Sequence, residues 1–300
     1  MKPRVAIFLL LWLTLFSALA QNGRVGLTTL NCNAFFGGGE TKMQLGQPQT
    51  APDFWRKAQN LVGLWPANPP TFVALEEIGG LREVGYLAKL AAARYHHSFQ
   101  PVFAKTKDIY TKEAVGALVD LSQGWGITGT PGRDPILDKV LSKHLVIKLT
   151  NAVTALEICV VHLHRPTGKY ATLQQQDQNA ALKKWADARL AKNPRANLVI
   201  LGDFNEGKEP GAADASVAAL QPPGGPLRDA FLQTGGHFKT HADGKAFDRI
   251  MLSEPLLKGA AGLKFEKVFV QEHTHGKGAY RYWFTDHFPV TAVFVPVAKK

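Results

Sequence analysis

Polar residues of one kind collect where the strand-like segments of this sequence end. Four segments end in, or are followed by, a carboxylate, an amide or an imidazole, and in two others such residues stand near or before the start of the segment. The residues are Asn31, Glu76, Glu77, His162, His164, Asp203, Asn205, Asp248, Asp286 and His287. Acidic and amide side chains at the ends of buried strands are costly unless they are paired or hold a metal ion. Taken together, they indicate one functional site rather than a series of unrelated turns.

The residue types in this set predict a site for a hard divalent cation. Carboxylate and amide oxygens are the ligands that Mg²⁺, Mn²⁺ and Ca²⁺ prefer, and histidines beside them can act as general acid and general base. A cation with carboxylates and imidazoles supplies what hydrolysis of a phosphate ester needs: charge neutralisation, an activated water and a protonated leaving group. We therefore expect Mg²⁺ as the cofactor, with Mn²⁺ or Ca²⁺ as alternatives.

Many short strands and a few helices must position these residues. Apolar runs bounded by turn residues recur along the whole chain, as is typical of strands. The runs are Val25–Asn31, Thr71–Leu75, Val115–Leu121, Leu145–Leu149, Ala155–His162, Asn197–Leu201, Ala246–Leu252, Leu263–Val270 and Pro289–Val295. Apolar residues at helical spacing occur in Asp53–Leu64, Leu81–Tyr95 and Thr172–Ala191. This pattern predicts an α+β sandwich in which helices cover the outer faces of the sheets.

The N-terminal residues have the pattern of a secretory signal. Lys2 and Arg4 precede the apolar run Val5–Phe16, and an Ala-x-Ala sequence ends at Ala20. We expect residues 1–20 to be a signal peptide that is cleaved near Ala20, which predicts a secreted or periplasmic protein. A retained membrane anchor is the alternative, although the apolar run is short for a spanning helix.

Composition limits the class of protein and its partners. Hydrophobic residues make up 45% and charged residues 20%, which excludes a disordered chain, collagen and a coiled coil. The Gly- and Pro-rich stretches read as loops rather than linkers, so residues 21–300 are expected to form a single domain. The net charge of +11 favours polyanions or anionic lipid head groups as partners. Cys32 and Cys159 match no zinc spacing, and they would pair only if their strands lie side by side.

The order of the motifs resembles the endonuclease/exonuclease/phosphatase superfamily, which includes deoxyribonuclease I, abasic-site endonucleases, neutral sphingomyelinases and inositol-polyphosphate 5-phosphatases. The matching motifs are Leu30-Asn-Cys-Asn33, Leu75-Glu-Glu-Ile78, His162-Leu-His-Arg-Pro166, Gly202-Asp-Phe-Asn205, Phe247-Asp-Arg-Ile250 and Thr285-Asp-His-Phe-Pro-Val290. They extend over nearly all of the mature chain. The resemblance implies a deoxyribonuclease I-like four-layered β-sandwich of two packed mixed sheets flanked by helices, with the active site at one edge.

The resemblance also implies a metal set. Glu77 matches the main metal carboxylate of the family, with Asn31 beside it, and Asp286 matches a second carboxylate on the metal side. The sequence departs from the family at two positions. Glu76 replaces the usual Gln, so it either adds charge near the metal or faces elsewhere. Asn33 stands where abasic-site enzymes have an Asp, which weakens an assignment to DNA repair.

Catalytic roles follow from the same resemblance. Asp203 and Asn205 match the pair that positions the nucleophilic water and the phosphate. His287 matches the histidine of the phosphate pocket, as general base or as stabiliser of the transition state. Asp248 matches the carboxylate that orients this histidine, as the acid of a catalytic triad does.

A further histidine is expected at the end of the strand Ala155–His162. The deoxyribonuclease I strand that ends Leu-His-Ser-Ala-Pro favours His164, whereas branches with the histidine before a leucine favour His162. We predict His164, with His162 as the supporting alternative, and we expect both to point to the same face of the strand. Glu113 is the candidate acidic partner.

Two active classes and one inactive class fit these residues. We expect a nuclease that acts on DNA or RNA, because Lys and Arg bind a phosphodiester backbone. The alternative is a sphingomyelinase-like or other phospholipid or small phosphoester hydrolase. The third class, a binding protein without catalysis, is disfavoured by the intact motifs. The aromatic and basic stretch His273–Phe284 could stack on bases, insert into a membrane or pack into the core. No protein partner is inferred, and a monomer is expected.

Overall fold

The computed structural model describes residues 23–36, 51–206, 215–222, 225–236, 238–276 and 283–297. The predicted signal peptide lies outside the described residues, as do Tyr280 and Tyr282 of the aromatic stretch. Within the described part of the chain, no helix is long and apolar enough to cross a membrane.

Two six-stranded mixed sheets pack face to face. The first has the order β11-β12-β1-β2-β4-β3 and the second β5-β6-β7-β8-β10-β9. The strands of the first are β11 Leu263–Val270, β12 Val290–Pro296, β1 Val25–Phe35, β2 Phe72–Ile78, β4 Ala114–Asp120 and β3 Phe99–Ala104. Those of the second are β5 Gly126–Gly132, β6 His144–Thr150, β7 Ala155–His162, β8 Leu198–Asp203, β10 Asp248–Ser253 and β9 Leu227–Asp229. Within each sheet one central pair is parallel, β1 with β2 and β7 with β8.

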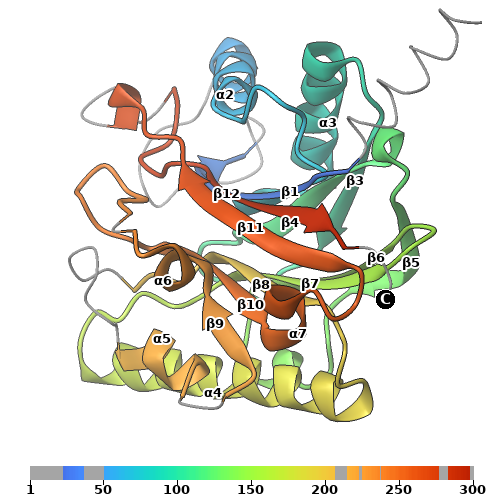
Figure 1. Cartoon of the computed structure of the whole chain (residues 1–300). Coiled ribbons are helices and arrows are strands. Elements are labelled where there is room, and N and C mark those ends of the chain that lie inside the picture. The colour runs from blue at the N-terminus through green and yellow to red at the C-terminus, as the bar shows by residue number, and fades with distance from the viewer. Residues whose placement is uncertain are drawn as a thin grey trace, which may run out of the picture.

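Helices cover both outer faces, so the molecule has four layers (Figure 1). Helices α2 and α3 lie on the first sheet, and α4 and α5 lie on the second. The helices are α2 Ala51–Gly63, α3 Leu81–Tyr95, α4 Lys169–Lys192, α5 Ala215–Leu220, α6 Ala230–Thr234 and α7 Glu254–Lys258, with short 3₁₀ turns at η1 Leu121–Gln123, η2 Leu137–Lys139 and η3 Thr274–Gly276. The predicted α+β sandwich is confirmed.

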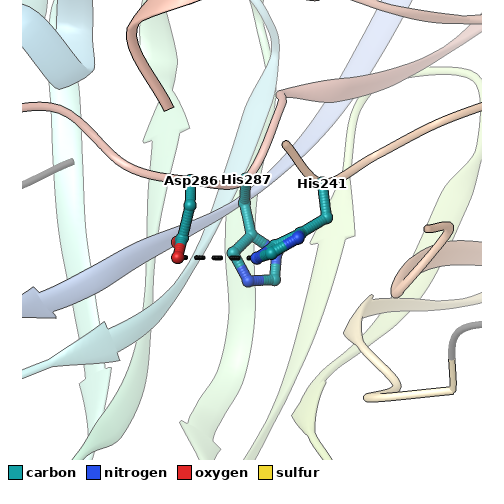
Figure 2. A group of neighbouring side chains, drawn as sticks. All are labelled: His241, Asp286 and His287. Atoms are coloured by element: carbon teal, nitrogen blue, oxygen red, sulfur yellow. Dashed lines mark ion pairs between the residues drawn. The ribbon is translucent and has the colours of Figure 1, made fainter. Parts of the chain in front are cut away.

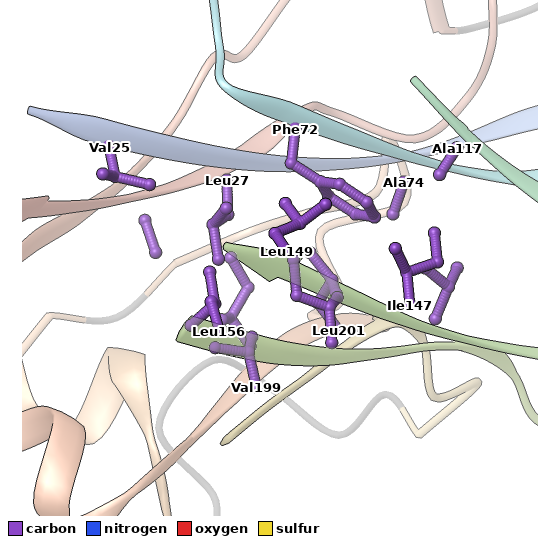
Figure 3. Packing of buried hydrophobic residues seen from close by; sticks show 14 of the residues in the cluster. Val25, Leu27, Phe72, Ala74, Ala117, Ile147, Leu149, Leu156, Val199 and Leu201 are labelled. Atoms are coloured by element: carbon purple, nitrogen blue, oxygen red, sulfur yellow. The ribbon is translucent and has the colours of Figure 1, made fainter. Parts of the chain in front are cut away.

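Three apolar clusters hold the layers together. One fills the space between the sheets, where Leu27 and Phe72 of the first sheet face Leu149 and Leu201 of the second (Figure 3). The other two lie between each sheet and its helices. Side chains alternate along a strand, so a central strand such as β2 buries one set of residues against the other sheet and the next set under helices. This explains why the central strands read as nearly continuous apolar runs.

The strands that the sequence pattern missed are all at sheet edges. Strands β3, β5 and β9 end their sheets, and β3 and β5 contain Pro101 and Pro131. An edge strand leaves one row of backbone groups without a neighbouring strand, so proline is tolerated there. Gln123–Pro135, one of the Gly- and Pro-rich stretches that we expected to be loops, therefore contains the whole of β5. The predicted helices are confirmed to within three residues at each end.

The two cysteines are separate. Cys32 lies on β1, in the cluster under α2 and α3, and Cys159 lies on β7, in the cluster under α4. Both are buried free thiols. The two strands belong to different sheets, and the side chains face opposite outer layers, so no disulfide joins them.

Gly202 is required where β8 runs beside β7. Its φ is +142°, a conformation that side chains rarely adopt, and a Cβ built there would lie 1.9 Å from the carbonyl oxygen of Val161. The oxygen belongs to the backbone of the neighbouring strand, so it cannot move aside without disturbing the sheet. The glycine lets the chain turn directly before Asp203.

We predict that Gly202→Ala destabilises the fold by more than ~2 kcal/mol, because the strained backbone and the clash add together. Gly132→Ala is the matched control, since it replaces another strand glycine where a Cβ meets nothing within 4 Å. Urea denaturation followed by circular dichroism measures both variants. Equal stability of the two would contradict this account of Gly202.

Candidate active site

The predicted site residues meet at one edge of the sandwich because of strand register. Asn31 pairs with Glu76 across the parallel strands β1 and β2. In the other sheet, Asp203 at the end of β8 has His162 of β7 on one side and Asp248 of β10 on the other. The parallel pairs end at the same edge of their sheets, so these polar residues face one another across the sandwich.

The side-chain amide of Asn31 joins two carboxylates at the centre of the site. Its Nδ2 donates to Oε1 of Glu77 and to Oδ2 of Asp203, at 2.9 Å in each case. Its Oδ1 accepts from the backbone N–H of Asn33 at 2.8 Å. The amide nitrogen therefore faces the carboxylates, and in this geometry Asn31 holds them in place as a donor.

A turn of the backbone brings Glu77 into the site. Glu76 faces the space between the sheets, so strand alternation alone would turn Glu77 away. Instead, Glu77 has a φ of +55°, and its Oε2 accepts from the backbone N–H of Ala34 at 2.8 Å. Asn33, Ala34 and Asn205 also have positive φ. Such conformations cost of order 1–3 kcal/mol each and cluster at functional sites.

Glu76 is not on the open side of the site. It is fully buried, and its Oε1 accepts from the hydroxyl of Thr29 at 2.8 Å. Burial, together with the charge of Asp248, raises the pKa of Glu76 well above its usual value. Of the alternatives that the sequence left open, facing elsewhere is the one that the structure shows.

His287 and Asp248 form a buried pair across the two sheets. Nδ1 of His287 lies 2.8 Å from Oδ2 of Asp248. Burial alone would lower the pKa of His287, but Asp248, Asp203 and Asp286 outweigh it and raise the pKa well above 6.5. The other ring nitrogen, Nε2, lies 3.9 Å from Oδ2 of Asp203. These carboxylates thus favour the protonated form of the imidazole, whose second nitrogen lies on the side of Asp203.

The structure brings His162 to this group and leaves His164 outside. Nε2 of His162 lies 3.8 Å from Oε1 of Glu77 and 3.8 Å from Oδ2 of Asp203. Burial and the positive charge of Lys143 hold the pKa of His162 well below 6.5. His164 is exposed, and its backbone N–H donates to Gln178. The expectation that both face the same way is wrong, because β7 ends at His162 and side-chain alternation ends with it.

Glu113, predicted as the acidic partner of His164, lies near His162 instead, and its side chain hydrogen-bonds to a lysine. One ligand atom each of Glu77, Glu113 and His162 lie within 4.8 Å of one another. Oε2 of Glu113 accepts from Nζ of Lys143 at 2.6 Å. Burial lowers the pKa of Lys143, but Glu113 outweighs burial and raises it. The sequence analysis missed Lys143, which sits in an ordinary Ser-Lys-His context before β6.

Asn205 fixes the turn after β8. Its backbone N–H donates to Oδ1 of Asp203 at 2.7 Å, and its Nδ2 donates to the carbonyl of Leu163 at 2.9 Å. These contacts fix Asn205 directly beside Asp203. Burial raises the pKa of Asp203, although His287 and Asn31 oppose the shift.

Asp286 lies beside His241 and next to His287 in the chain. Its Oδ2 is 3.5 Å from Nε2 of His241, and its backbone carbonyl accepts from Ala242. Burial alone would raise the pKa of Asp286, but His241 and His287 lower it to about 2. His241 was missed in the sequence because it lies in a turn rather than at a strand end.

Lys57 is a second cation that the sequence analysis missed. It is 1% exposed and donates to the carbonyl oxygen of Asn33. Burial lowers its pKa to about 8, while the charges of Glu77 and Asp286 oppose the shift. The sequence spacing could have identified it, because Lys57 lies on the same face of α2 as the buried residues Phe54 and Leu61.

The carboxylate side of the site fits a divalent cation. Burial and the neighbouring Glu113 raise the pKa of Glu77 to about 7, since this carboxylate stands among others of the same charge. A bound cation would relieve that repulsion. The oxygens of Glu77 and Asp203 are hard donors, which suits Mg²⁺. The roles of Glu77 and Asp286 as ligands are predictions. The expected ligand role of Asn31 does not fit this geometry, because its amide nitrogen faces the carboxylates and its oxygen accepts from Asn33.

The described end of the aromatic stretch packs against the protein. The Arg56 guanidinium lies 4.5 Å from the ring centroid of Trp283, and Asn60 donates to the carbonyl of Trp283. Phe284 stacks on His275 with the ring centroids 4.3 Å apart. Both aromatic side chains are half-buried, so this part of the stretch contributes to packing near the site.

Comparison with solved structures identifies the fold. A D. rerio TDP2 structure with a single-strand DNA product superposes with a TM-score of 0.61 at 19% identity, over 90% of this chain and 98% of that one. The human Nocturnin catalytic domain with a bound sulfate anion gives 0.61 at 14% identity, over 91% and 95%. An endonuclease/exonuclease/phosphatase family protein from Bacteroides thetaiotaomicron gives 0.59 at 11% identity, over 92% and 98%.

The chain thus has the deoxyribonuclease I-like fold of the endonuclease/exonuclease/phosphatase superfamily, as the motif order predicted. The likeness covers about nine-tenths of the chain in each case. No protein-family model matches the sequence, and no curated protein matches it by sequence similarity.

We predict that His287 is protonated and His162 neutral at pH 7, from the opposite shifts of their pKa values. Asp248→Asn should lower the pKa of His287, because it removes the negative charge that stabilises the imidazolium. NMR titration of the ring resonances measures both. Asp177→Asn, which replaces an exposed carboxylate on α4, is the control. An unchanged His287 pKa in Asp248→Asn would contradict this electrostatic account.

Proposed function

We propose that the protein is an exported, divalent-metal-dependent phosphodiesterase, and that its substrate is a nucleic acid, DNA or RNA. The activity rests on one observation above all: the paired His287 and Asp248 face Asp203 beside the carboxylate of Glu77. This places an oriented, protonated imidazole, a buried carboxylate and a candidate cation ligand around one point. Export is supported by the pattern of residues 1–20.

The chain's own residues divide the work of hydrolysis. Asp203 and Asn205 would orient the attacking water, and Asp203 would accept its proton, since burial raises the pKa of this carboxyl. His287, charged and held by Asp248, would stabilise the negative charge that develops on the phosphoryl oxygens. His162, which stays neutral, would hydrogen-bond to the water or to a phosphoryl oxygen.

Glu77 would hold the divalent cation, with Asp286 as the further ligand that the resemblance implies. Asn31, whose Nδ2 donates to Glu77 and Asp203, would position these two carboxylates. The cation would neutralise charge on the phosphate and on the leaving oxygen. Lys57 and Lys143 lie close enough to Glu77 to affect its pKa, so they contribute fixed positive charge on the same side.

Nucleic acid is favoured as substrate by charge and by likeness. The net charge of +11 suits a phosphodiester backbone. One structural neighbour, D. rerio TDP2, is complexed with a single-strand DNA product. The alternative is a phospholipid or small phosphoester hydrolase, and its main support was the aromatic stretch. In the described part of that stretch Trp283 contacts α2 and Phe284 stacks on His275 of the same stretch.

The first functional prediction concerns metal and substrate. The purified mature protein should cleave plasmid DNA or RNA with Mg²⁺ and lose this activity in EDTA, because the site offers oxygen ligands. DNA binding by His287→Ala should weaken steeply with salt, with a slope of log K against log[salt] of about −0.9 for each duplex phosphate contact.

Sphingomyelin liposomes are the comparison in the same assay. Hydrolysis of sphingomyelin without cleavage of either nucleic acid would overturn the nucleic-acid substrate and leave the phosphodiesterase. Full activity after dialysis against EDTA would overturn the metal requirement.

Substitution of the proposed catalytic groups should lower activity. His287→Ala and Asp203→Ala should each lower kcat by at least ~10²-fold, the usual scale for a positioned acid–base group. His162→Ala should lower kcat more than His164→Ala, because only His162 lies near Glu77 and Asp203. Steady-state kinetics, with thermal melts as a check on folding, measures these losses. A larger loss in His164→Ala would contradict the role given to His162.

A further inference from the structure

Three side chains on the imidazole-rich side of the site converge on one point. The ligand atoms, one from each side chain of His241, Asp286 and His287, all lie within 4.8 Å of one another. Figure 2 shows that the three side chains point toward one another. Nε2 of His241 is 3.5 Å from Oδ2 of Asp286. Around a tetrahedral Zn²⁺ with bonds of about 2.0–2.1 Å, ligand atoms lie about 3.3 Å apart. One pair is therefore close to that spacing, and small side-chain rotations would bring in the third atom.

The backbone fixes the two histidines opposite each other. His241 and His287 form an antiparallel bridge, with the N–H of Ala242 donating to the carbonyl of Asp286 and the N–H of Phe288 donating to the carbonyl of Thr240. The two rings have centroids 4.7 Å apart at an angle of 81°. The three side chains are thus brought together by an isolated backbone bridge, although His241 and His287 are far apart in sequence.

Two further carboxylates orient both imidazoles. Nδ1 of His241 lies 2.6 Å from Oδ1 of Asp243, and Nδ1 of His287 lies 2.8 Å from Oδ2 of Asp248. Histidines that bind metals usually donate the other ring N–H to a carboxylate in this way, which fixes the tautomer and leaves Nε2 for the ion. His287 is 7% exposed, and its Nε2 is too far from Asp203 for a hydrogen bond.

We propose that His241, Asp286 and His287 form a binding site for a transition-metal ion such as Zn²⁺. Two imidazoles and one carboxylate favour Zn²⁺ and its neighbours over Mg²⁺, which prefers oxygen ligands. The site differs from the oxygen-rich set around Glu77 in its donors and shares with it the carboxylate of Asp286.

The ion inhibits the enzyme when it binds. This consequence rests on the proposed function, in which Nε2 of His287 contacts the phosphoryl group. A Zn²⁺ ion coordinated at Nε2 removes that contact, so Zn²⁺ at a concentration near its dissociation constant blocks a reaction that Mg²⁺ supports.

Direct binding tests the site without reference to activity. Zn²⁺ is titrated calorimetrically into protein that has been stripped of transition metals and is held in excess Mg²⁺. In a separate titration, the visible absorption of Co²⁺ reports whether imidazoles bind the ion. Asp243→Asn should weaken Zn²⁺ binding by about 10–100-fold, the usual effect of losing a carboxylate that orients a ligand histidine. His241→Ala should weaken it further. His96→Asn is the matched control, since it removes an exposed histidine after α3.

The results separate the site from the function. Equal Zn²⁺ affinity in wild type, Asp243→Asn and His241→Ala would overturn the site, and so would an equal loss in His96→Asn. Tight Zn²⁺ binding that depends on His241 would sustain the site even if no phosphodiesterase activity were found, in which case the proposed function alone fails. In the active enzyme, inhibition by Zn²⁺ should shift to higher concentration in His241→Ala and Asp243→Asn. Inhibition unchanged in both variants would overturn the inhibitory role.

Discussion

The arrangement of the site depends on one amide group that joins the two sheets. Nδ2 of Asn31, on the first sheet, donates to Glu77 of the same sheet and to Asp203 of the second. Carboxylates buried between sheets lose hydration and repel each other, and a shared donor offsets part of that cost. The amide reaches both carboxylates only at the edge where the parallel strands of both sheets end. The packing of the two sheets therefore decides where the chemistry can take place.

A second contact across the sheets, between His287 and Asp248, favours a positive charge on the imidazole among the buried carboxylates. His287 precedes β12 of the first sheet, whereas Asp248 begins β10 of the second, and their side chains meet at 2.8 Å. The hydroxyl of Thr285 also donates to the carbonyl of Asn31, which ties the segment before β12 to β1. Buried polar groups of this kind stabilise a fold only when each finds its partners. The same contacts thus serve both the packing of the sheets and the chemistry at their edge.

The site has two sides that differ in donor chemistry. Carboxylate and amide oxygens gather around Glu77 and Asp203, where a hard cation fits. Beside His287, His241 adds an imidazole nitrogen and Asp286 adds a carboxylate oxygen. His287 stands between the two sides, so its charge and ligation couple them. Positive φ angles at Glu77 and Asn205 show that backbone strain is concentrated on the oxygen-rich side, where it aims the side chains.

The sequence by itself determined the fold class, the central strands and the residues that end them. Continuous apolar runs and polar strand ends are local patterns, and they follow from burial on both faces of a strand. Edge strands such as β3 and β5 were not predicted from the sequence, because proline and glycine are tolerated where one side of a strand has no neighbour. The position of His162 inside the site and of His164 outside it, the donor role of Asn31 and the inward turn of Glu77 were decided only by the tertiary structure. So were the contributions of Lys57, Lys143 and His241. Each of these depends on where a strand stops, on a backbone torsion or on a residue distant in sequence, and none of these is set by the local pattern of side chains.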